Sequence, residues 1–188
     1  MRKLITSIIL AVVASHFTGC DGKPVDWVKE GWKSFEEGDY PSAITNFQQA
    51  ITENASDAEA YNGLGWCYLF DDSLSKSITN FEASLSFENL IDANAGVALA
   101  LAELSDFSHA VTHASVVINA SPSYVFSHHT SVDIKMIRLT KAKSAAALGD
   151  FTTALNEVKA IESAFDADPS TPEGQAAILQ KIEELISG

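Results

Sequence analysis

Four histidines lie close enough together in the sequence to suggest a metal site. His109 and His113 are four residues apart on one predicted helical face, and His128 and His129 follow in the next connection. Imidazole is a common zinc ligand, but a metalloprotease helix carries a glutamate directly after its first histidine, and that glutamate is missing here. Neither a cysteine nor an acidic ligand pairs visibly with the group. We therefore expect no metal, with the histidines at the surface or at a groove edge, and a zinc enzyme is the weakest of three hypotheses.

Nucleophilic and phosphate-binding patterns are also weak. The sequence has no serine in the context of a nucleophile elbow, and Cys67 falls among predicted core positions, where a thiol acts as a small apolar side chain. Gly63 and Gly65 belong to a helical repeat and not to a glycine-rich phosphate loop. The sequence therefore predicts no catalytic residue and no cofactor, and we do not expect an enzyme.

Composition limits the remaining classes of protein. The 188 residues are 46% hydrophobic and 20% charged, which is enough for one packed domain. The formal net charge of −13 argues against a nucleic-acid partner. The densest basic group, Lys135, Arg138, Lys141 and Lys143, spreads around more than one face of a helix. We expect this group to be a solvated helix surface.

The first twenty residues have the order of an export signal. Arg2 and Lys3 precede an apolar stretch from Leu4 to Ala14, and small residues lead to Cys20. The segment "FTGC" resembles the bacterial lipobox. The resemblance implies that residues 1–19 are a lipoprotein signal peptide and that Cys20 carries acyl chains such as palmitate, followed by a short linker within residues 20–23. The chain would then be anchored to a membrane of the bacterial cell envelope, facing the periplasm in a Gram-negative cell, with the inner or outer membrane left open. An ordinary signal peptide cut elsewhere is the alternative.

A repeat organises the rest of the chain. The stretch "AITNFQQAI" at residues 43–51 returns as "SITNFEASL" at residues 77–85, and the 34-residue step from Phe47 to Phe81 also joins Gly31 to Gly65. A fixed period of this length is typical of stacked helical pairs. Because one pair cannot bury its apolar face alone, neighbouring pairs must stack into a continuous core.

The residues at these positions resemble the tetratricopeptide repeat (TPR) over about residues 24–168. The resemblance implies an all-α, right-handed solenoid of about four helical hairpins. The domain would span residues 24–188, with repeats at about 24–57, 58–90, 91–124 and 131–168 and a capping helix at about 172–187. The capping helix places Ile178, Ile182 and Leu185 on one face. The fourth repeat departs from the pattern in its first helix.

In this family the first helix of each hairpin lines the concave side, so its residues would face a partner. The predicted partner-binding residues on these helices are Trp32, Phe35, Asn62, Trp66, Leu69, Phe70 and Leu99. We expect an open aromatic patch that binds a protein or peptide client. The carboxylate clamp of chaperone-binding members is not expected, because only Asn62 of its residues is present. Alternatively, Trp32, Trp66 and Phe70 pack against one another or against the neighbouring repeat.

One insertion interrupts the array. Residues 123–132, "SYVFSHHTSV", carry Tyr124 and Phe126, our second choice for partner contact, unless the two only cover the junction of the third and fourth repeats. The sequence thus predicts a membrane-anchored TPR lipoprotein that acts as a non-catalytic protein-interaction scaffold. The alternative is a self-associating structural lipoprotein whose aromatic concave face is a homodimer interface.

Overall fold

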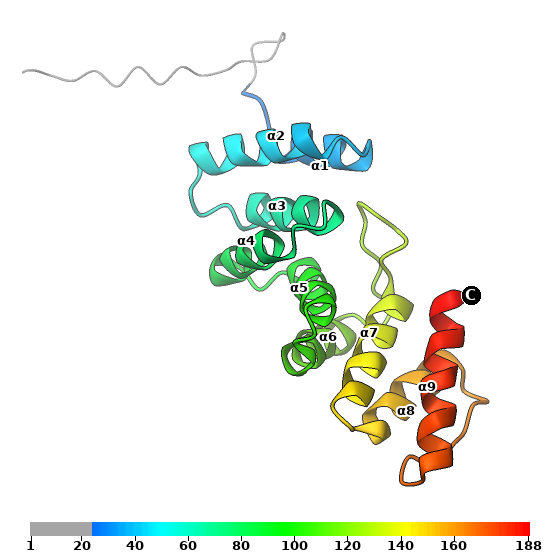
Figure 1. Cartoon of the computed structure of the whole chain (residues 1–188). Helices are drawn as coiled ribbons and strands as arrows, with labels where there is room; N and C mark the ends of the chain where they lie inside the picture. Colours follow the sequence, from blue (N-terminus) through cyan, green and yellow to red (C-terminus); the bar gives the residue numbers. More distant parts are fainter. Residues whose placement is uncertain (1–23) are drawn as a thin grey trace, which may run out of the picture.

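The computed structural model describes residues 24–188, which form an all-α stack of helical hairpins (Figure 1). The hairpins are α1 (Trp27–Glu36) with α2 (Tyr40–Glu53), α3 (Ala58–Phe70) with α4 (Leu74–Phe87), α5 (Ile91–Glu103) with α6 (Phe107–Ala120), and α7 (Ile134–Ala147) with α8 (Phe151–Ile161). The last helix, α9 (Pro172–Ser187), packs on α7 and α8. The expected all-α, TPR-like fold is confirmed. The predicted signal peptide and Cys20 lie outside the described residues.

Aspartates start most of the helices. Each of these side chains accepts a hydrogen bond from the backbone N–H three residues later, which satisfies a donor that the helix itself leaves unpaired. The capping residues are Asp26, Asp39, Asp57, Asp106, Asp133 and Asp150. Local sequence therefore fixes where these helices begin.

The turn inside each hairpin contains one residue with left-handed backbone. Gly38 (φ 77°) and Gly149 (φ 81°) adopt it without the steric penalty of a Cβ atom, whereas Asp72 (φ 56°) and Ser105 (φ 62°) adopt it with one. The same tight turn thus recurs in all four hairpins, which keeps the two helices of each hairpin side by side.

Phenylalanine rings pack against glycines where neighbouring hairpins meet. The ring of Phe47 lies against Gly31 of its own hairpin and Gly63 of the next, and a Cβ atom at either glycine would overlap the ring. Phe81 lies in the same way against Gly65 and Gly96. Each ring is fully buried, so the spacing between hairpins depends on a large residue filling the space that two small residues leave.

The odd-numbered helices form the inner row of the arc. Contacts join α1 to α3, α3 to α5, α5 to α7 and α7 to α9, while α4 and α6 lie on the outer side of α3 and α5 (Figure 1). The inner row is the concave face of the stack. No helix within residues 24–188 is both long and apolar enough to cross a membrane.

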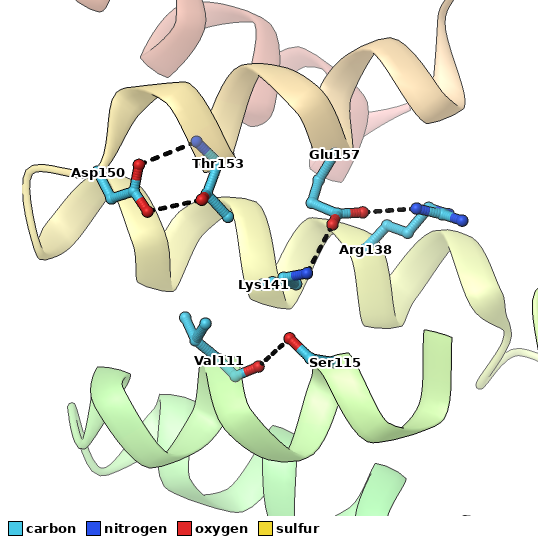
Figure 2. A network of polar contacts seen from close by, with 7 residues as sticks. All are labelled: Val111, Ser115, Arg138, Lys141, Asp150, Thr153 and Glu157. Atoms are coloured by element: carbon cyan, nitrogen blue, oxygen red, sulfur yellow. Dashed lines mark hydrogen bonds and ion pairs between the residues drawn. The ribbon is translucent and has the colours of Figure 1, made fainter. Parts of the chain in front are cut away.

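An ion-pair network joins the two helices of the last hairpin. Arg138 Nη1 and Lys141 Nζ, both on α7, lie 2.6 and 2.8 Å from the two carboxylate oxygens of Glu157 on α8 (Figure 2). Glu157 is nearly buried, and both cations are largely covered. The prediction of a solvated basic surface is therefore wrong for Arg138 and Lys141, because both side chains pair with Glu157 on the facing helix and are largely covered. Lys135 and Lys143 are exposed.

Candidate functional site

The concave face of the first two hairpins holds a cluster of aromatic rings. Trp32 and Phe35 project from α1, and Trp66 and Phe70 project from α3, one repeat later. The ring centroids are 5.5 Å apart for Phe35 and Phe70 and 6.3 Å apart for Trp66 and Phe70. We call these four residues the aromatic groove. Trp32 and Trp66 are one repeat apart, and equivalent positions of adjacent first helices stack side by side. Phe70 lies one position after the equivalent of Phe35.

A loop from elsewhere in the chain fills this groove. Residues 122–133, which we call the groove loop, leave α6 and extend from the start of α7 toward α1 and α3 (Figure 1). Phe126 stacks on Trp66 with centroids 4.1 Å apart and an angle of 18° between the planes, and it meets Trp32 and Phe35 edge-on at 5.9 and 6.1 Å. Phe126 is fully buried. The loop therefore inserts a ring among three others.

The expected open aromatic patch is wrong for the isolated chain. The exposed fractions of Trp32, Phe35 and Trp66 are 6%, 2% and 0%, because Phe126 and the neighbouring loop residues cover them. Asn62 and Tyr124 are also buried, while Leu69 and Phe70 are partly buried against the same core. Phe126 also reaches beyond the junction of the third and fourth hairpins, since its ring contacts are with α1 and α3.

The two histidines of the loop complete the cover. The imidazole of His128 is stacked on the indole of Trp32 at 3.9 Å with an angle of 2°, and its Nδ1 lies 2.7 Å from Oε1 of Glu36. The ring of His129 lies 4.7 Å from that of Phe70. Both histidines are thus placed at the groove edge by aromatic contacts.

Two carboxylates lie near the stacked rings of His128 and Trp32. Glu36 Oε1 lies 2.7 Å from His128 Nδ1, and Glu59 Oε1 lies beside the indole of Trp32. Burial raises the pKa of Glu59 despite the hydrogen bond that Trp32 Nε1 donates to its Oε1 at 3.0 Å. Burial likewise raises the pKa of Asp92. The carboxylate of Glu36 therefore offers a partner for a cation at this end of the groove.

The site contains no arrangement that predicts catalysis. Within the part of the chain that the structure describes, no three His, Cys, Asp or Glu side chains lie close enough to hold a metal ion. The ring of His109 lies 2.9 Å from the carboxylate of Asp106, the N-cap of the same helix, and the ring of His113 lies 2.9 Å from Asn94 Oδ1. The four histidines therefore do not form one cluster. Burial raises the pKa of the Cys67 thiol to about 12, which leaves little thiolate at neutral pH.

A second, open part of the concave face lies between α5, α7 and α9. It is a cavity of about 550 Å³, and of the predicted partner-binding residues only Leu99 lines it. Its other apolar walls are Phe107, Met136, Leu139, Leu185 and Ile186, and its charged rim includes Glu103, Asp133, Lys135 and Lys143. The predicted site residues therefore fall into two places. Leu99 lines the open cavity, and the others lie in or around the closed aromatic groove.

Sequence reasoning missed the residues of this cavity and the role of the loop histidines. One available signal was that Leu185 and Ile186 are adjacent, so a single buried face of α9 cannot hold both. Another was the density of aromatic and imidazole rings in the insertion, which is high for a solvated loop. Neither signal reveals which surface such residues contact.

Comparison with known proteins supports the repeat. A family model described as TPR repeat matches residues 33–69. The fold is similar to that of YrrB, described as a TPR protein with an unusual peptide-binding site, with a TM-score of 0.68, 16% identity and coverage of 85% of this chain and 84% of that chain. It is also similar to MamA from AMB-1 (TM-score 0.65, 17% identity, 86% and 91% covered) and to TTC0263, a thermophilic TPR protein from Thermus thermophilus (0.57, 19%, 86% and 80%). No curated protein sequence matches the chain.

Proposed function

We propose that this chain, a TPR-repeat protein, is a non-catalytic scaffold that holds a segment of another protein on its concave face. The observation that carries the proposal is the open cavity between α5, α7 and α9. Its volume of about 550 Å³ lies within the range of known ligand sites. In YrrB, a protein of similar fold, the site is described as peptide-binding.

The lining indicates what kind of segment would fit. Leu99, Leu139 and Leu185 provide an apolar floor, and the exposed Ile186 extends it to the rim. Among the described residues, no carboxylate lies within ion-pair distance of the ammonium groups of Lys135 and Lys143. Asp133 is engaged as the N-cap of α7, through Met136 N at 2.9 Å. A partner segment with an apolar anchor flanked by acidic residues would bury the anchor and meet two free cations.

Site-specific photocrosslinking tests the proposal. A benzoylphenylalanine in place of Met136, on the cavity wall, should crosslink the full-length chain to a partner protein in its native cells. The same group in place of Gln48, which is exposed on α2 and does not line the cavity, is the matched control. Discrete products from position 136 alone would support the scaffold. Equal products from both positions, or none from either, would contradict it.

We also propose that the scaffold is anchored to a bacterial envelope membrane through Cys20. The lipobox-like segment before Cys20 supports this proposal. Replacing Cys20 by serine removes the thiol that would carry the lipid, so the variant should leave the membrane fraction. A Cys20→Ser protein that stays in the pellet after a carbonate wash would contradict the anchor.

Self-association through the aromatic face is less well supported. That face is buried against Phe126 and His128 of the same chain, so a second copy would first have to displace the groove loop. Light scattering of the purified protein over a range of concentrations distinguishes a monomer from such a dimer.

A further inference from the structure

We propose that the aromatic groove is itself a binding site for an extended partner segment in which an aromatic residue is followed, two positions later, by a histidine or arginine. The groove loop occupies this site as an internal competitor. The inference rests on the proposed scaffold function, because a segment that replaces the loop must come from a protein partner. It adds a second site, with its own specificity, to the open cavity.

The first position is defined by Phe126. Its ring stacks on Trp66 and is enclosed edge-on by Trp32 and Phe35, and none of it is exposed. Offset-stacked and edge-to-face contacts of this kind favour a flat aromatic ring over an aliphatic side chain of similar volume. The groove thus selects an aromatic anchor.

The second position is defined by His128. Its ring lies flat on the indole of Trp32, and its Nδ1 faces the carboxylate of Glu36. A second carboxylate lies beside the same indole, because Trp32 Nε1 donates a hydrogen bond to Glu59 Oε1 at 3.0 Å. A planar cation that stacks on an indole and meets a carboxylate would be favoured here, and an acidic side chain would be repelled.

The loop holds its place through side chains. Several backbone hydrogen bonds close the loop on itself, among them Phe126 N to Val132 O at 2.8 Å and Ile134 N to Tyr124 O at 2.8 Å. Its contacts with α1 and α3 include the three rings and the bond to Glu36. Tyr124 and Val132 of the loop are buried in the same core cluster. A competing segment that copies the loop sequence would therefore replace the loop through side-chain contacts of the same kinds.

The loop is also an incomplete ligand. Trp66 Nε1 and Asn62 Oδ1 are fully buried in α3, and neither has a hydrogen-bond partner among the described residues. Buried polar groups are normally paired, and an extended peptide brings both N–H donors and carbonyl acceptors. An external segment can thus satisfy the groove in a way that the loop does not.

The test supplies the loop sequence as a separate molecule. The probe is a fluorescein-labelled peptide, SYVFSHHTSV, which copies residues 123–132, and binding to the full-length chain is followed by fluorescence anisotropy. A Phe126→Ala/His128→Ala chain, whose loop has lost both anchors, should bind the peptide at least tenfold more tightly than the unmodified chain. The matched control is Val125→Ala, since Val125 is 52% exposed on the same loop and should leave the groove closed.

A folding control and a second variant accompany the binding measurement. Far-ultraviolet circular dichroism and a single cooperative unfolding transition establish that each variant is folded. If the double variant does not fold, His128→Ala, which retains Phe126, should still bind the peptide at least threefold more tightly than the unmodified chain. A folded variant that binds no more tightly than Val125→Ala overturns the inference.

Peptide variants test the specificity. Alanine in place of the peptide's phenylalanine should weaken binding at least tenfold, and so should glutamate in place of its first histidine. Arginine at that histidine should preserve binding. Equal affinities for the arginine and glutamate peptides would overturn the proposed cation position.

The cavity function and the aromatic-groove site can each be overturned without affecting the other. Crosslinks at Met136 without peptide binding would overturn the aromatic site and leave the cavity function standing. Peptide binding without crosslinks at Met136 would overturn the cavity function instead.

Discussion

The imidazole of His128 lies flat on the indole of Trp32, 3.9 Å away, although one belongs to the groove loop between α6 and α7 and the other to the first helix. In most repeat arrays each unit contacts only its neighbours, so stability is close to a sum of local terms. Here the loop connects the fourth hairpin to the first and second. We therefore expect the array to unfold as one unit, and the loop contacts to contribute to the stability of hairpins far away in the sequence.

Truncating the ring at the centre of the groove should destabilise the whole array. Phe126→Ala removes a fully buried ring, which should lower the free energy of unfolding by about 3 to 5 kcal/mol. Val125→Ala, at an exposed neighbour, should change it by less than about 0.5 kcal/mol. Urea unfolding followed by circular dichroism measures both, and coincident midpoints would show that the loop does not hold the groove.

Gly63→Ala should destabilise the protein even though alanine is the better helix former. In an exposed helix Gly→Ala stabilises by about 1 kcal/mol, but a Cβ atom at Gly63 would overlap the Phe47 ring. Gly63→Ala should therefore lower stability by about 1 to 3 kcal/mol. Adding Phe47→Leu, which removes the clashing ring atoms, should make the double variant more stable than the sum of the two single changes predicts. Strict additivity would contradict the contact.

The network in the last hairpin should be sensitive to removal of its single anion. Glu157→Gln leaves Arg138 and Lys141 largely covered without a carboxylate, which should destabilise by about 3 kcal/mol. The control is Asp166→Asn, which breaks the solvent-exposed pair with Lys159 and should leave stability nearly unchanged. Thermal unfolding compares them, and similar melting temperatures would mean that the network adds no stability.

The half-buried carboxylate of Glu59 should make stability fall as the pH rises. Because burial raises the folded-state pKa of Glu59 above its ordinary 4.5, the folded chain binds this proton more tightly than the unfolded chain. Below pH 4.5 both states are protonated and Glu59 costs nothing. Its cost appears as the pH rises above 4.5 and is complete above the raised pKa.

Glu59→Gln removes that ionisation and keeps an oxygen for Trp32 Nε1. Relative to the parent chain, this variant should gain stability as the pH rises from about 4.5 to the raised pKa of Glu59. Denaturation curves at several pH values measure the difference. A constant difference across that range would contradict a raised pKa.

The helices and their stacking followed from the sequence because their determinants are short-range. The aspartate caps act over three residues, and the glycine–phenylalanine contacts recur with the repeat, so Phe47 and Phe81 occupy equivalent positions. The aromatic residues of α1 and α3 were correctly expected to meet for the same reason. The buried position of Cys67 followed from its place in that pattern.

Only the tertiary structure decided what covers the concave face. Whether Trp32 and Trp66 are open or closed depends on where the groove loop lies, and that follows from the curvature of the stack and the reach of residues 122–133, which no periodicity encodes. Arg138 and Lys141 likewise looked solvated until Glu157 on the facing helix was placed beside them. Whether a side chain is exposed depends on both surfaces of a contact. A repeat pattern predicts the contact with the neighbouring hairpin, but it does not predict a contact with a loop between α6 and α7.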